Sequence, residues 1–178
     1  MASGESGTIR LGAPVYRDAH HVIAVYETAV LTFSSQAPNP RYLEAWTRSV
    51  DHVLDQYQAG LLVMTIIDRN ANAPDDASKT SIRNTILRHA AQIEAFAYVV
   101  EGEGFRSAAM RSALSLISLA ARYPFPQKVF GNVEGAVPWM LSHPYRGEPG
   151  KRRPREPAKL IKVCTSLRDQ LGAVAAAG

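Results

Sequence analysis

The sequence predicts a single α/β domain with a central, mostly parallel sheet of four or five strands and about four flanking helices, followed by a basic linker and a C-terminal amphipathic helix. Three observations lead to this prediction. An unbroken apolar run over residues 60–68 opens at a glycine, closes at an acid, and has the length of a strand buried on both faces. A helical pattern of about twenty residues precedes this run, and another follows it. Strands that alternate with single helices pair in parallel through right-handed crossovers.

The first part of the chain is expected to supply a leader and a hairpin. Residues 1–12 read as a flexible leader that is small and polar and lacks the basic and apolar regions of a signal peptide. Two short strands, over residues 14–16 and 21–27, would form a hairpin that turns near residues 18–20. The second strand either continues through residues 30–33 or breaks into a loop.

A helix is predicted between this hairpin and the central strand. Asn39 is a good cap, Pro40 is a good first-turn residue, and Gly60 is well placed to end the helix. The apolar residues recur at steps of three and four and form one stripe, which is expected to pack on the sheet. The stripe consists of Leu43, Trp46, Val50, Val53, Leu54 and Tyr57.

Two further strands and three further helices are predicted after the central strand. A helix capped by Asp75 or Asp76 runs to about residue 92, and strands follow at residues 96–100 and 127–130. The first helix is expected to bury Ile82, Ile86, Leu87 and Ala90. The helix between the two strands is expected to bury Phe105, Ala109, Ser112, Leu116, Leu119 and Ala120. Asn132 caps the last helix, whose apolar residues are Val133, Ala136, Val137, Met140 and Leu141.

The composition is that of a globular protein. Of the 178 residues, 46% are hydrophobic and 20% are charged, which excludes an intrinsically disordered chain. No apolar run approaches the roughly 20 residues that span a bilayer. Cys164 is the single cysteine, so the chain has neither an internal disulfide nor a cysteine metal cluster. We therefore expect a cytoplasmic protein.

The C-terminal part carries the net charge of +4. Residues 144–157 contain four prolines, two glycines and most of the basic run, and are expected to form a basic linker after the domain of residues 13–143. The candidate electrostatic contacts to phosphates or an acidic partner are Lys151, Arg152, Arg153 and Arg155. A solvated, non-specific linker is the alternative. The apolar residues at 160, 164, 167 and 171 then predict an amphipathic helix over residues 158–171, which needs a surface to lie on.

Three stretches carry a likeness to a known family, namely residues 60–68, 96–101 and 129–140. The last stretch combines an aromatic residue, an acid, an alanine, and a tryptophan followed by an apolar residue. Together with the order of strands and helices, these stretches resemble the SpoIIAA-like, or STAS-like, domains related to anti-sigma-factor antagonists, over about residues 13–142. The resemblance implies a small, non-enzymatic bacterial regulatory module that works through protein contacts.

The resemblance also implies a switch by phosphorylation of a serine at the start of the helix after the central strand. Ser78 and Ser81 lie in this region and are candidate phospho-acceptors. The compact acid-serine-glycine signature of the family is absent, however, and the loop is longer. A phosphate here would meet free helix N–H groups and Lys79 or Arg83, but also Asp75 and Asp76, which repel it. The alternative is that both serines are ordinary first-turn helix residues.

The sequence lacks the common motifs of catalysis and metal binding. It contains no Gly-x-Ser-x-Gly motif, its five histidines lack metal-ligand spacing, and residues 102–107 lack the last glycine of the dinucleotide fingerprint. We therefore expect neither a metal nor a cofactor. Asp68 and Asn70 are candidate ligand-binding residues, because ligands of open α/β sheets bind at the carboxyl ends of the strands. Capping of its own loop is the alternative role of Asp68.

Three functions stay open. The first is a non-catalytic protein-interaction module, which requires a protein partner or self-association. The second is a small-molecule or lipid-binding protein, or an unrecognised enzyme, with a concave polar pocket near Asp68. The third is weak nucleic-acid binding through the basic tail, which modest salt would abolish. We favour the first, because the inventory of catalytic motifs is thin.

Overall fold

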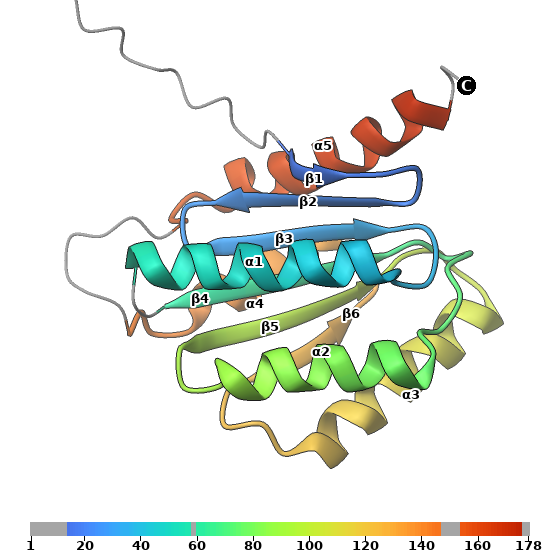
Figure 1. Ribbon diagram of the computed structural model, residues 1–178. Coiled ribbons are helices and arrows are strands. Elements are labelled where there is room, and N and C mark those ends of the chain that lie inside the picture. Colours follow the sequence, from blue (N-terminus) through green and yellow to red (C-terminus); the bar gives the residue numbers. More distant parts are fainter. Residues whose placement is uncertain (1–13, 58–59, 147–153, 176–178) are drawn as a thin grey trace, which may run out of the picture.

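The computed structural model describes residues 14–57, 60–146 and 154–175, which form one six-stranded sheet covered by helices on both faces (Figure 1). The strands are β1 (Pro14–Arg17), β2 (His21–Tyr26), β3 (Ala29–Ser34), β4 (Leu61–Ile67), β5 (Ile93–Val100) and β6 (Gln127–Phe130). The helices are α1 (Pro40–Tyr57), α2 (Asp76–Arg88), α3 (Phe105–Ala121), α4 (Val133–Ser142) and α5 (Pro157–Ala175). The predicted α/β fold class is confirmed.

The strands lie in the sheet in the order in which they follow along the chain, from β1 to β6. β2 is antiparallel to both β1 and β3, whereas β3, β4, β5 and β6 are mutually parallel. The sheet has one strand more than the upper end of the predicted range, because the chain reverses after β2. Tyr26 pairs with Ala29 across a two-residue turn, in which Glu27 has a positive φ of 54°. Residues 30–33 therefore lie in a separate strand.

Two apolar clusters fill the space between the sheet and its helices. α1 and α2 cover one face of the sheet, where Leu61, Val63 and Phe96 belong to one buried cluster that also contains Trp46 and Val53 of α1. α4 and α5 cover the opposite face (Figure 1). β4 lies between β3 and β5, and both of its faces contribute to these clusters. The predicted strand buried on both faces is thus the centre of the fold.

The predicted helix starts are supported by side-chain caps. Asn39 Oδ1 accepts the backbone N–H of Tyr42 at 2.9 Å, and Asp75 Oδ1 accepts the N–H of Ser78 at 2.7 Å. At the other end of α2 the prediction is wrong. The helix stops at Arg88, because the chain turns through residues 89–92 before β5, and Leu87 is 47% exposed rather than buried.

The prediction is also wrong for α3. All six residues of its expected core stripe are exposed, and Phe105 and Leu119 are exposed by 91% and 76%. The helix contacts β5 and β6 with its opposite face, on which Ser107 is buried and Met110 and Leu114 are half-buried. Sequence periodicity locates the apolar side of a helix, but it does not tell which side the protein covers.

α5 lies against β2, β3 and α4, and residues 158–171, where a C-terminal helix is predicted, lie within it. Its buried side chains join the same cluster as the sheet and α4, and they are Leu160, Val163, Cys164, Leu167 and Leu171. Residues 1–12 and the central part of the predicted linker, including Lys151, Arg152 and Arg153, lie outside the described residues. Among the described residues, no helix combines the length and the hydropathy needed to cross a bilayer.

Candidate functional site at the carboxyl edge of the sheet

The carboxyl ends of the four parallel strands lie at one edge of the sheet. His21, the first residue of β2, pairs with Ser34, the last residue of β3, so the β1–β2 turn lies at the same edge. The first turns of α1, α2, α3 and α4 also begin here, because each helix follows a parallel strand. This edge therefore gathers five loops, and the candidate ligand and phosphorylation residues lie in these loops or in the first two helical turns beside them.

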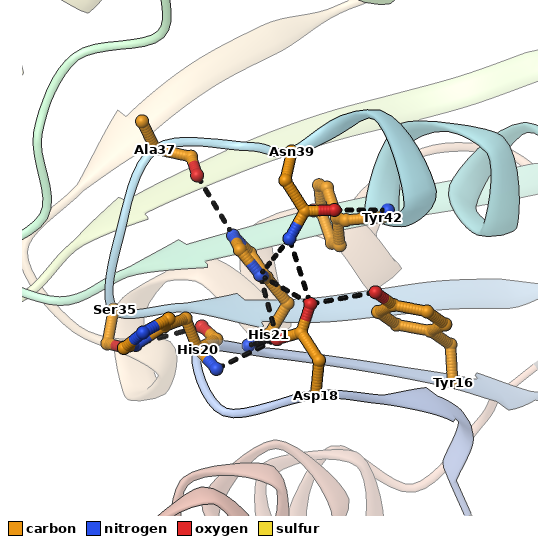
Figure 2. A network of polar contacts seen from close by, with 8 residues as sticks. All are labelled: Tyr16, Asp18, His20, His21, Ser35, Ala37, Asn39 and Tyr42. Atoms are coloured by element: carbon orange, nitrogen blue, oxygen red, sulfur yellow. Dashed lines mark hydrogen bonds and ion pairs between the residues drawn. The ribbon is translucent and has the colours of Figure 1, made fainter.

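A network of polar contacts centred on Asp18 holds one end of this edge together (Figure 2). Asp18 Oδ1 accepts the backbone N–H groups of His20 and His21 at 2.8 and 2.7 Å. Asp18 Oδ2 accepts the hydroxyl of Tyr16 at 2.7 Å and the side-chain amide of Asn39 at 2.9 Å. One carboxylate thus joins β1, β2 and the start of α1.

His21 is the buried partner of this carboxylate, with 1% of its surface exposed. Its Nδ1 lies 2.9 Å from Asp18 Oδ1, and its Nε2 lies 3.2 Å from the carbonyl oxygen of Ala37. The side-chain amide nitrogen of Asn39 also lies 3.4 Å from Nδ1, so both ring nitrogens have polar neighbours. The ring also stacks on Tyr42, with centroids 4.6 Å apart. His21 is therefore fixed on all sides and presents no free nitrogen to a substrate.

The pKa values of this network follow from its contacts. Burial alone would raise the pKa of Asp18, but hydrogen bonds from Asn39, the His20 N–H, Tyr16 and His21 outweigh it and hold the pKa well below its usual range. Burial, together with the hydrogen bond to Asp18, raises the pKa of Tyr16 to about 12. Asp18 is thus a carboxylate and Tyr16 a neutral phenol across the physiological range.

Asp68 and Asn70 lie in the loop after β4, at the same edge. Asp68 Oδ1 accepts the backbone N–H of Asn70 at 2.8 Å, and the Asp68 carbonyl accepts the N–H of Ala71 at 3.0 Å. Arg106 at the start of α3 reaches the Asn70 carbonyl at 3.4 Å. The carboxylate of Asp68 therefore orders its own loop, while the side chain of Asn70 is exposed.

The two candidate phospho-acceptors lie in different environments. Ser78, in the first turn of α2, is 6% exposed, and its Oγ lies 3.4 Å from the Pro38 carbonyl oxygen. Ser81 lies one turn further along α2 and is half-buried. Asp75, the cap of α2, has a pKa that hydrogen bonds from the Ser78 backbone and side chain lower. Of the two hydroxyls, that of Ser81 is the more accessible.

Glu101 at the end of β5 connects the edge to α5. Burial raises the pKa of its carboxyl group, and the Arg168 guanidinium, which forms an ion pair with it, opposes this effect.

Arg155 is exposed at the opposite edge of the sheet, where it lines a shallow cavity with Leu141, Tyr145 and Pro154. The structure thus separates Arg155 from Asp68, Asn70 and the serines.

The sequence offered a weak signal for the Asp18 network. The spacing Asp18-x-x-His21 in a predicted turn allows an aspartate to cap the turn and contact the imidazole, but the sequence reasoning assigned neither residue a role. The link to Asn39 and Tyr42 joins segments about twenty residues apart and depends on the pairing of strands. Within residues 14–57, 60–146 and 154–171, no three His, Cys, Asp or Glu side chains are grouped so that they could hold a metal ion.

Comparisons with known proteins agree with this architecture. No family model matches the sequence, and no curated protein matches it. The fold is similar to the crystal structure of an uncharacterized protein from the DUF3478 family, with a SpoIIAA-like fold, from Shewanella loihica PV-4. The two chains share 14% sequence identity with a TM-score of 0.53, and the similarity covers 71% of this chain and 98% of the other. This protein therefore has a SpoIIAA-like fold, as the sequence resemblance predicts.

Proposed function

We propose that the protein is a non-catalytic regulatory module that binds a protein partner through the carboxyl edge of its α/β body. The proposal depends on one observation, namely that the acids at this edge accept hydrogen bonds from the backbone. Asp18 and Asp68 accept backbone N–H groups of their own loops, and Asp75 accepts that of Ser78 in the first turn of α2. Acids held in this way order loops and are poorly placed to exchange protons with a substrate. Loops that are ordered before binding lower the entropic cost of association.

The SpoIIAA-like fold supports a regulatory role, and the proposal includes the bacterial cytoplasm as the place of action. Phosphorylation is the proposed switch. A phosphate on Ser81 would add a charge of about −1.5 to −2 beside this edge. A phosphate on Ser78 would instead separate α2 from the loop before α1, because the Ser78 hydroxyl is buried against the Pro38 carbonyl. Ligand binding near Asp68 has less support, since Asp68 is engaged by Asn70.

Affinity capture from the lysate of the native cell, read by mass spectrometry, tests the proposal. The full chain is the bait, because removal of α5 would uncover one face of the core. Arg69→Glu changes an exposed charge in the loop after β4 and is expected to lower recovery of the partner at least tenfold. Arg88→Glu, which changes an exposed charge at the far end of α2, is the matched control and should leave recovery unchanged.

The tail is tested in the same experiment. A variant with Lys151→Gln, Arg152→Gln, Arg153→Gln and Arg155→Gln removes four positive charges from the tail and leaves the sequence of the α/β body unchanged. The proposal expects this variant to keep the partner. A partner or nucleic acid that is lost with the basic charge, and retained by Arg69→Glu, would assign the function to the tail. Recovery of the bait alone would contradict the proposal.

A further inference from the structure

α3 presents its apolar side to solvent. Of the six large hydrophobic side chains that are exposed among the described residues, four belong to this helix, namely Phe105, Leu116, Ile117 and Leu119. Ala109, Ser112, Ala113 and Ala120 are exposed beside them. Neither of the two core clusters includes a residue of α3. An apolar helix face of this extent marks an interaction surface.

The opposite side of α3 is attached to the sheet by polar contacts. Arg111 Nη1 donates to the carbonyl oxygens of Val100 and Gly102, both at 3.1 Å, and Ser107 Oγ donates to the Glu101 carbonyl at 3.1 Å. Near the C-terminal end, Gln127 of β6 donates to the Ser118 carbonyl at 2.9 Å. These hydrogen bonds, together with the half-buried Met110 and Leu114, attach the helix to the sheet, and its most exposed hydrophobic side remains available for another molecule.

The exposed side is almost free of charge. α3 contains no acid, and the guanidinium of Arg111 is turned toward the sheet. Arg106, in the first turn, reaches the Asn70 carbonyl and the Asn72 side chain. A strongly charged partner would therefore find no complementary groups along this face, whereas an apolar, uncharged surface of the same shape would fit it.

We infer that the occupant of this face is α3 of a second copy of the chain, in antiparallel orientation. Five positions, Phe105, Ala109, Ser112, Leu116 and Leu119, follow one another at steps of four, three, four and three residues, the spacing of paired helices. After Phe105, the stripe has two small residues, Ala109 and Ser112, and then two leucines, Leu116 and Leu119. Antiparallel pairing therefore places Ala109 opposite Leu119 of the second copy, and Ser112 opposite Leu116 of the second copy. Large side chains then meet small ones, as close packing requires.

The size and position of α3 are suitable for such a contact. A helix of 17 residues is about 25 Å long and about 10 Å wide, so two such faces cover on the order of 500 Å² in projection, in the range of weak, transient interfaces. α3 lies at the side of the molecule, over β5 and β6 (Figure 1). The contact is therefore a weak two-fold dimer, and it does not depend on partner binding at the carboxyl edge.

Sedimentation equilibrium of the full chain, from about 1 to 500 μM, tests the inference, because this range covers the weak association that a small interface allows. The expected result is a monomer–dimer equilibrium that Leu116→Glu with Leu119→Glu shifts to monomer by at least tenfold in Kd. Leu87→Glu, at an exposed apolar residue of α2, is the control and should leave the Kd unchanged. Circular dichroism should show the same fold for all variants, because the substituted side chains are exposed.

Disulfide trapping tests the orientation. Chains with Ala109→Cys mixed with chains with Leu119→Cys should cross-link, while Ala109→Cys alone should not, and the native Cys164 is buried. A chain that stays monomeric throughout the range, or a dimer that the double glutamate variant leaves intact, overturns the inference. Cross-linking of Leu119→Cys with itself would contradict the antiparallel orientation. A monomer that binds phosphatidylcholine vesicles through the α3 leucines would make the face a membrane contact instead.

Discussion

A single carboxylate, that of Asp18, joins three segments at the carboxyl edge. It connects the β1–β2 turn, the buried ring of His21 and the cap of α1 at Asn39. Because hydrogen bonds lower the pKa of Asp18 despite its burial, the folded state favours the charged form more than the unfolded chain does. This contribution to stability is complete above the unfolded pKa of about 4, and it is lost as the pH falls toward the lower folded pKa.

Asp18→Asn is expected to reduce the free energy of unfolding by about 2–3 kcal/mol at pH 7, because it removes a charged acceptor from several hydrogen bonds. The variant should also lose stability less steeply than the wild type as the pH falls below about 4. Urea unfolding between pH 2 and pH 7 measures both effects. Asp55→Asn, at an exposed position of α1, is the matched control and should change neither. Equal pH dependence in wild type and Asp18→Asn would contradict the assignment.

The two serines of α2 should differ in their tolerance of negative charge. Ser78→Asp buries a carboxylate next to Asp75 and should reduce the free energy of unfolding by about 2 kcal/mol or more. Ser81→Asp, at a half-buried position one turn away, should stay within about 0.5 kcal/mol of the wild type. Chemical denaturation compares the two, with Ser78→Asn and Ser81→Asn as uncharged controls. Similar stability of both aspartate variants would mean that Ser78 has room for a charged group.

At the scale of helices and strands, the sequence correctly predicts the features that depend on residues close together in the chain. Asn39, Asp75 and Asn132 each cap the helix that the sequence assigns to them, because a cap depends on residues two or three positions away. The course of the chain after β2 and the exposure of α3 depend on distant segments. The apolar stripe of α3 is present in the structure as the sequence predicts, but it faces away from the sheet. The pattern of apolar residues gives no indication that Arg111 attaches this helix to the sheet.

Arg111→Ala is expected to loosen α3 without unfolding the sheet. The guanidinium is the donor that connects the helix to two carbonyl oxygens at the end of β5, and a lost hydrogen bond to a charged group costs about 1.5–3 kcal/mol. Native-state hydrogen exchange should show faster exchange in α3, with little change in β4. Arg48→Ala removes an exposed ion pair on α1 and is the control, because such pairs contribute about 0–1 kcal/mol. Uniform acceleration across all elements would contradict a local role for Arg111.

At the scale of the whole molecule, α5 completes the core. The sequence indicates an amphipathic helix after a linker, but the surface that it covers follows only from the structure. Leu160 and Leu167 are fully buried, in the cluster that also contains Leu31 of β3 and Met140 of α4. The Glu101–Arg168 ion pair fixes the same helix to the carboxyl edge. The sheet, α4 and α5 should therefore unfold together.

Leu167→Ala tests this cooperativity. The substitution leaves a cavity under α5 and should reduce the free energy of unfolding by about 2–5 kcal/mol. The two tryptophans report on opposite faces of the sheet, since Trp46 packs in the α1 layer and Trp139 packs beside Phe130 in the α4 layer. In backgrounds with Trp139→Phe or Trp46→Phe, fluorescence should show the same shift of the urea midpoint at both probes. A shift confined to Trp139 would mean that α4 and α5 unfold as a separate unit, and that the core on that face is not coupled to the rest of the sheet.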